Sequence, residues 1–217
     1  MKGDLFMPTR AELKQNAKDC IREQALNPIL VTLVYTLIIT AISLLGGILG
    51  ATVFIPFILS IASIGVQIGY IYYCMKVAKR EQGAYADLAY LIQNWRFGLK
   101  LVALSFLINI LVSLWSLLFL IPGVIKAISY SQAIMIMLEN PNIDIMTALK
   151  ESQKMMDGHK MEYFVLDLSF ILWGLLVAVT FGIASLWVSP YIQITMVNYY
   201  NILKNPNQSS AKVVLEY

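Results

Sequence analysis

Six apolar stretches alternate with polar segments along the chain. Most of them approach the roughly 20 apolar residues that an α-helix needs to cross a bilayer. The pattern therefore predicts an all-α membrane protein with six transmembrane helices. The predicted spans cover residues 29–49, 57–75, 97–121, 124–138, 163–181 and 186–203.

Two kinds of connection separate the predicted spans. The turns at 46–56, 121–125 and 182–188 contain glycine or proline and carry no charged residue. Pro122 and Gly123 stand in the second of these turns, and such a pair typically ends one helix and begins the next. The other connections carry lysine or arginine. The spans are thus expected to pair as three helical hairpins.

A short amphipathic helix is predicted before each hairpin, at 9–26, 85–94 and 144–156. The first begins at Thr9 with Glu12 three residues later, which is the spacing of a capping box. Basic residues line one face of the first and third helices, as expected of helices that lie on an anionic membrane surface. The residues predicted to bind that surface are Lys14, Lys18, Arg22, Lys150 and Lys154.

This plan of a surface helix followed by a hairpin occurs three times. The predicted units cover about 9–80, 84–141 and 142–205 of a single membrane domain spanning 1–217, and 206–217 form a C-terminal tail. Each unit contains two spans, so all units would share one orientation. We therefore expect parallel repeats around a pseudo-threefold axis along the membrane normal.

One glutamine recurs in the returning span of each unit, at Gln67, Gln132 and Gln193, with spacings of 65 and 61 residues. A glutamine amide in hydrocarbon needs hydrogen-bond partners. The three amides are expected either to meet on the central axis, where they could contact a ligand, or to hold neighbouring helices together. Tyr130 and Tyr191 stand two residues before the second and third glutamines and are candidates for the same path.

Composition and charge agree with a membrane protein. The 217 residues are 59% hydrophobic and 13% charged, whereas soluble domains are about 25% charged. Lysine and arginine near span ends stay cytosolic, so both termini are expected in the cytoplasm. The net charge is +3, and no segment of the sequence is basic enough to neutralise many phosphates. Nucleic acid is therefore not an expected partner.

Besides Lys100 near the start of the third span, two charged side chains stand inside predicted spans, Lys126 in the fourth and Asp167 in the fifth. Ionisable groups at membrane depth are costly and often functional. Lys126 is expected either to anchor to lipid phosphates at the outer surface or to contact a ligand. Asp167 is expected to pack against or cap the cytosolic helices.

Conventional catalytic and metal-binding patterns are missing from the sequence. His159 is the single histidine and stands in a predicted cytosolic turn, where it cannot form a zinc site alone. We therefore predict no catalytic residue, no metal and no cofactor. Cys20 and Cys74 are expected to be buried, reduced thiols on the cytosolic side, and the N-terminus shows no signal-peptide pattern.

An ordered set of short motifs resembles a bacterial integral-membrane family known as domain of unknown function 975. The motifs cover residues 120–131, 139–141, 148–152, 155–160 and 168–174, followed by Pro190-Tyr191 and Tyr199-Tyr200. This chain departs from the family at Ala127-Ile128, where a glycine followed by an aromatic residue is usual. The resemblance implies a multi-pass protein of the bacterial cell membrane with no settled activity. The plan is more distantly similar to the membrane domain of some glycerophosphodiester phosphodiesterases, which suggests lipid-related partners.

Three functional hypotheses follow. The first is a non-enzymatic membrane protein that binds lipid, a peptide or a partner membrane protein, in a scaffold or accessory role. The second is a transporter or channel for a small solute or peptide, with the three glutamines and Lys126 along its path. A lipid-processing enzyme that uses His159 with Asp157 or Glu162 is the third. A water-filled cavity along the central axis would favour the transport hypothesis. An axis filled by apolar side chains would favour the binding hypothesis.

Overall fold

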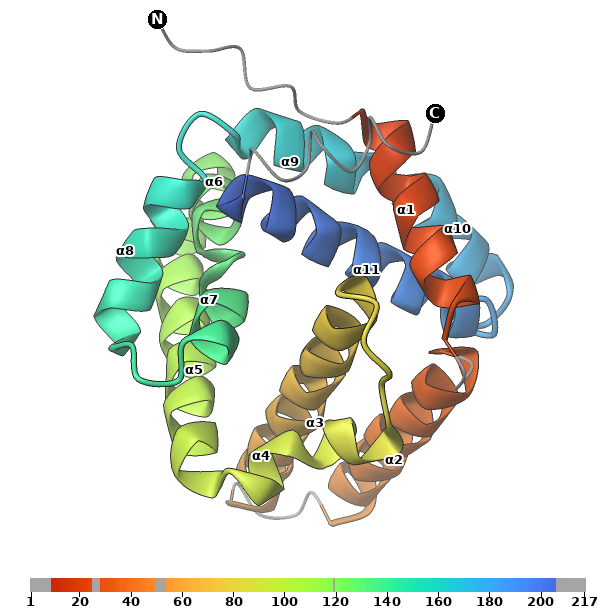
Figure 1. Cartoon of the computed structure of the whole chain (residues 1–217). Helices are drawn as coiled ribbons and strands as arrows, with labels where there is room; N and C mark the ends of the chain where they lie inside the picture. Colours follow the sequence, from red (N-terminus) through yellow and green to blue (C-terminus); the bar gives the residue numbers. More distant parts are fainter. Residues whose placement is uncertain (1–8, 25–27, 50–53, 119, 206–217) are drawn as a thin grey trace, which may run out of the picture.

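The computed structural model describes residues 9–24, 28–49, 54–118 and 120–205. These residues form helices and no β-strand, which confirms the all-α class (Figure 1). The helices are α1 (Arg10–Arg22), α2 (Pro28–Leu49), α3 (Phe54–Ala78), η1 (Tyr85–Ala89), α4 (Tyr90–Gln93), α5 (Trp95–Leu118), α6 (Leu120–Tyr130), α7 (Ala133–Glu139), α8 (Ile145–Met155), α9 (Lys160–Leu168), α10 (Ile171–Val179) and α11 (Ser185–Lys204).

Five helical segments of the described chain are long and apolar enough to cross a membrane. They match the first five predicted spans. Their bounds are Pro28–Ile48, Phe57–Ala78, Trp95–Leu117, Ile121–Glu139 and Lys160–Val179. Apolar side chains on α2, α5 and α10 point outward, including Ile48, Leu117 and Leu172, which are 78%, 85% and 74% exposed. Such large exposed apolar surfaces are characteristic of proteins that lie in lipid.

The helix α11 covers the predicted sixth span but is not among these five segments. It lies between α1, α3 and α7 in the middle of the molecule (Figure 1), and 11 of its 20 residues are buried. A helix that is enclosed by protein can carry polar side chains such as Gln193 and Asn198, because neighbouring helices rather than lipid surround it. Its lower hydropathy therefore follows from its central position.

Residues 121–125, predicted as a turn, lie within a helix. The helix α6 begins at Leu120 and continues through Pro122 and Gly123. Proline is tolerated in a first helical turn because the N–H groups there have no intrahelical acceptor. Pro122 and Gly123 thus belong to the start of the returning helix, and the prediction that they separate two helices was wrong.

Two predicted spans are interrupted. The fourth breaks at Ser131 and Gln132, between α6 and α7, and the fifth breaks at Ser169 and Phe170, between α9 and α10. At both breaks a serine bonds twice to the carbonyl three residues earlier, through its N–H and its hydroxyl: Ser131 to Ile128, and Ser169 to Leu166. This local bonding tightens the chain and competes with the regular helical pattern. The expectation of continuous helices was therefore wrong at these two points.

The amphipathic helices are present, with one difference. The Thr9–Glu12 capping box forms, and Asp144 caps α8 through the N–H of Met146. The second predicted helix begins as the 3₁₀ helix η1 and becomes α-helical only in α4. The apolar face of α1, with Leu13, Ala17 and Cys20, is buried against protein. Because α1 packs mainly on α11, that face is not available to lipid.

Two further predictions concern residues outside the described ranges. The predicted tail at 206–217 lies wholly outside them, and so do residues 50–53 of the first uncharged turn.

Candidate functional site

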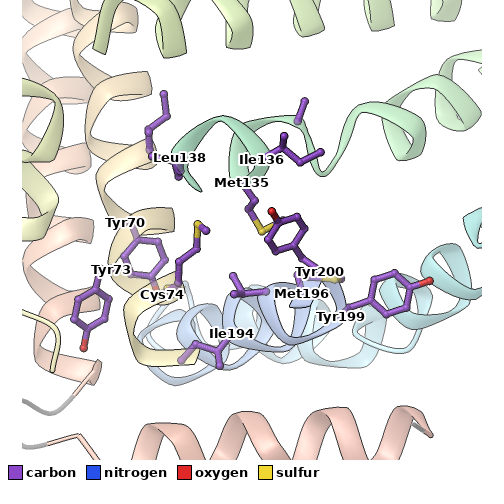
Figure 2. Close-up of a cluster of buried hydrophobic side chains, with 14 of the residues drawn as sticks. Tyr70, Tyr73, Cys74, Met135, Ile136, Leu138, Ile194, Met196, Tyr199 and Tyr200 are labelled. Atoms are coloured by element: carbon purple, nitrogen blue, oxygen red, sulfur yellow. The ribbon is translucent and has the colours of Figure 1, made fainter. Parts of the chain in front are cut away.

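The three returning segments α3, α7 and α11 meet around a cluster of buried side chains (Figure 2). Tyr70 and Cys74 come from α3, Met135 from α7, and Met196 and Tyr200 from α11. All five side chains are at most 8% exposed, and most of their atoms are apolar. The three segments are therefore joined by a packed interior.

A single carboxylate links the C-terminal ends of these segments. Glu139 is the last residue of α7, and its side chain is 9% exposed. Lys79, which follows α3, lies 2.8 Å from one carboxylate oxygen, and Lys204 of α11 lies 2.5 Å from the other. The hydroxyl of Tyr200 donates a hydrogen bond of 2.6 Å to the second oxygen. Such charge-assisted hydrogen bonds are stronger than neutral ones, and here they connect three helices.

A cavity of about 350 Å³ opens beside this cluster. Lys76, Lys79 and Lys204 line it together with Glu81 and Glu139. The lysine side chains are 25%, 42% and 41% exposed, so their ammonium groups remain accessible to a bound group. Lys79 and Lys204 share one carboxylate, which leaves this pair with one net positive charge.

The wall of the cavity is partly aromatic and apolar. Tyr72 and Leu138 contribute to it, and the ring of Tyr72 stacks on Tyr90 with ring centres 4.1 Å apart. Lys76 lies 5.8 Å from the centre of the Tyr72 ring and forms an ion pair of 3.0 Å with Asp87. The arrangement can accept an anionic group at the lysines while an apolar part lies against the wall.

Side chains of surface helices cover both span breaks. The hydroxyl of Ser152 on α8 donates to the carbonyl of Ser129 at 2.8 Å and accepts from the N–H of Gln132 at 3.2 Å. It therefore satisfies backbone groups that the break leaves without helical partners. At the other break, the Lys14 ammonium of α1 lies 3.5 Å from the carbonyl of Ser169 and 4.4 Å from the centre of the Phe170 ring.

Lys14 is therefore held in a partly buried position. Burial, together with the nearby positive charges of Arg10 and Lys18, lowers the pKa of its ammonium. Lys18 lies 5.9 Å from the centre of the Tyr191 ring, whereas Arg22 is exposed. The two predicted surface-binding residues on α8, Lys150 and Lys154, are exposed as well.

The three repeated glutamines have different surroundings. Gln67 is exposed, Gln193 is half-buried and Gln132 is completely buried. Gln132 donates to the hydroxyl of Ser131 at 2.8 Å, but its side-chain carbonyl has no hydrogen-bond partner among the described residues. The glutamines thus do not occupy equivalent positions in this structure.

The structure brings two of the remaining predicted site residues, Lys126 and Tyr130, close together. Lys126 lies beside Trp115 and Tyr130, with its nitrogen 5.3 Å and 5.9 Å from the two ring centres. Tyr191 is buried against Phe170. Asp167 is exposed at the end of α9, just before the second break.

The single histidine and the two cysteines occupy different surroundings. His159 lies in a turn, where its ring contacts Glu162 at 3.1 Å. Cys20 and Cys74 are buried, as expected. Within the described ranges, no group of three or more histidine, cysteine, aspartate or glutamate residues could hold a metal ion.

Sequence reasoning missed the Glu139 cluster. The available signal was its spacing, because Lys79 and Lys204 stand 60 and 65 residues from Glu139, close to the spacing of the repeated glutamines. Residues separated by one repeat length occupy comparable ends of successive units. A search for opposite charges at that spacing would have indicated this junction.

The family model described as "Protein of unknown function (DUF975)" matches residues 7–131 and 118–207. These two overlapping matches cover most of the chain, and the chain therefore belongs to this family. No curated protein and no solved structure matches it.

Proposed function

We propose that this member of the family crosses the bacterial plasma membrane six times and binds anionic lipid headgroups at the cavity beside Glu139. The observation that carries the proposal is the set of three partly exposed lysines, Lys76, Lys79 and Lys204, around that cavity. Lysine is a common ligand for phosphate, which it binds as a point charge.

The proposed topology places this cavity at the cytosolic membrane surface. Lys76 and Lys79 stand at the C-terminal end of the α3 span, and Lys204 ends α11. Lysines at span ends favour the cytosolic side, where anionic lipids attract positive charge. The exposed apolar surfaces of α2, α5 and α10 support the presence of acyl chains around the same bundle.

Headgroup chemistry fits the arrangement of charge. Glu139 holds Lys79 and Lys204 close together but neutralises only one of them. The lining as a whole contains three lysines with Glu81 and Glu139, and the one net positive charge that remains would be neutralised by a phosphate near Lys79 and Lys204. The aromatic wall at Tyr72 would then lie beside the glycerol and upper acyl region of the same molecule.

The packing of the junction favours binding over transport. The returning segments meet on methionine, tyrosine, leucine and isoleucine side chains (Figure 2). Neither the cavity beside Glu139 nor a second, mainly apolar cavity of about 300 Å³ between α1, α9 and α11 is lined by a glutamine. A filled junction with dispersed amides supports a binding or scaffold role.

Transport of a small solute is the second candidate, and the two span breaks favour it. Interrupted helices at membrane depth are common at the substrate sites of transporters. Gln132 stands at one break with a buried carbonyl that accepts no hydrogen bond from the described residues. A transport role would require a solute to reach that carbonyl, and uptake into vesicles would detect it.

Native mass spectrometry of the detergent-purified protein with added phosphatidylglycerol or phosphatidylcholine tests lipid binding. The test variant combines Lys79→Gln, Lys204→Gln and Glu139→Gln, so that no carboxylate is left without its partners. Each well-placed lysine contributes about 1 kcal/mol toward anionic lipid. The three changes together remove one net positive charge, so we expect the variant to bind phosphatidylglycerol roughly fivefold more weakly, since about 1.4 kcal/mol is tenfold.

The matched control is Lys100→Gln, which removes one exposed positive charge from α5, outside the lining of this cavity. This control should retain the preference of the native protein for phosphatidylglycerol. Equal binding of both lipids by the native protein would contradict the proposal, and so would an equal loss in the control. A melting curve for each variant establishes that it is folded.

A further inference from the structure

Lys126 lies near the tip of the α5–α6 hairpin, between two aromatic rings. Its nitrogen is 5.3 Å from the centre of the Trp115 ring on α5 and 5.9 Å from that of Tyr130 on α6. Trp115 is 38% exposed, whereas Tyr130 is buried. The ammonium group therefore lies over one buried ring and beside one ring that faces outward.

Close helix packing builds this arrangement. A Cβ atom added to Gly123 would lie 2.1 Å from the hydroxyl of Ser116 and 2.8 Å from its Cα, so only glycine permits this approach of α6 to α5. Ser116 is the neighbour of Trp115, and Lys126 follows Gly123 by three residues. The glycine thus brings the tryptophan and the lysine together.

The described surroundings of Lys126 contain aromatic and apolar side chains. Among the residues that the structure describes, no carboxylate lies within ion-pair distance of its nitrogen. The outward side chains near it are apolar: Leu114, Leu117, Ile121 and Ile125 are all at least 45% exposed. Aromatic faces attract a cation but do not neutralise it. An anion from outside the protein would stabilise a cation in such apolar surroundings.

We propose that Lys126, Trp115 and Tyr130 form a binding site for the phosphate of an anionic phospholipid in the leaflet at the hairpin tip. The lysine chain reaches from α6 toward the headgroup region, as lysines near span ends do. The phosphate neutralises the ammonium group, and Trp115 lies beside the glycerol region, where tryptophan is favoured. A zwitterionic lipid fits less well because its own cationic headgroup competes for the phosphate.

This second site is separate from the cavity beside Glu139. Thirteen residues separate Lys126 from Glu139 along the returning segment. In the proposed topology the two sites face opposite leaflets. A negative result for lipid binding at one site would therefore leave the proposal for the other site intact.

Tryptophan quenching by brominated lipids tests the proposal, because Trp115 is itself part of the site. The purified full-length protein is reconstituted in vesicles that contain brominated phosphatidylglycerol, or brominated phosphatidylcholine at the same fraction. Subtracting the signal of Trp115→Phe isolates the contribution of Trp115. One well-placed lysine is expected to enrich the anionic lipid roughly fivefold at its surface. Quenching of Trp115 should therefore be stronger with the brominated anionic lipid.

Two variants at the same position complete the test. Lys126→Gln should remove the excess quenching, and Lys126→Arg should keep it. The variant that combines Lys79→Gln, Glu139→Gln and Lys204→Gln should leave it unchanged, which separates this site from the cytosolic one. Equal quenching by the two lipids in the native protein would overturn the proposal, as would an excess that persists in Lys126→Gln. Melting curves verify that the variants are folded.

Discussion

At the scale of single residues, charge pairing determines how the returning segments are joined. The sequence reveals that Glu139 and Lys204 stand at the ends of apolar stretches, but it does not reveal that they meet. Their contact depends on where α7 and α11 lie in space, and 65 residues separate them. By contrast, the Thr9–Glu12 capping box was predictable, because both partners lie within one helical turn.

Replacing Glu139 by glutamine should destabilise the protein. The change removes the shared counter-charge of Lys79 and Lys204 and weakens the acceptor of the Tyr200 hydroxyl. A lost partner at a mostly buried polar site costs about 1–3 kcal/mol. Thermal unfolding in detergent should register this as a lower melting temperature. Glu151→Gln on the exposed face of α8 is the control, and an equal decrease in that variant would contradict the assigned role of Glu139.

At the scale of elements, periodicity predicted where helices lie but not where they are interrupted. Hydropathy averages over about 20 residues, so a break of two residues inside an apolar stretch leaves almost no signal. Ser131 and Ser169 are compatible with a continuous helix by composition alone. The breaks depend on groups from other elements, since Ser152 and Lys14 supply contacts at the interrupted backbone.

Ser152→Ala should weaken the attachment of α8 to the first break. The variant leaves the buried N–H of Gln132 without its acceptor and the carbonyl of Ser129 without its donor. The expected cost is about 1–3 kcal/mol, and hydrogen exchange should increase at the amide of Gln132. Thr147→Ala on the exposed face of α8 controls for helix propensity. Unchanged exchange at Gln132 in the Ser152 variant would argue against this contact.

Two glycines on helices should respond to alanine with opposite signs. A Cβ atom at Gly69 would lie 2.3 Å from the backbone carbonyl oxygen of Leu88, so alanine there would force α3 away from η1. Gly174 on α10 has no atom within 4 Å of such a Cβ. We expect Gly69→Ala to lower stability by about 1–3 kcal/mol, as overpacking does. Gly174→Ala should be neutral or stabilising by up to about 1 kcal/mol. Melting temperatures of the two variants give the comparison, and similar values would disprove the tight approach at Gly69.

At the scale of the whole molecule, the sequence predicted the all-α class and the five most apolar spans, because lipid-facing helices must be apolar in nearly every turn. It did not predict that α11 would lie at the centre, where buried Thr195 and Asn198 are enclosed by neighbouring helices. Nor did it predict the loss of equivalence among the glutamines, since Gln67 is exposed whereas Gln132 is buried. A similar sequence pattern in each unit does not impose the same packing on each.

In the proposed topology, all three returning segments end at one membrane face. Cysteine accessibility in intact cells tests it, with single cysteines introduced into a variant that carries Cys20→Ala and Cys74→Ala. We expect Ile48→Cys and Phe181→Cys, near the hairpin tips, to react with an impermeant thiol reagent. Ala84→Cys and Asp157→Cys should react only after the membrane is permeabilised. Labelling of position 84 or 157 from outside intact cells would contradict the account.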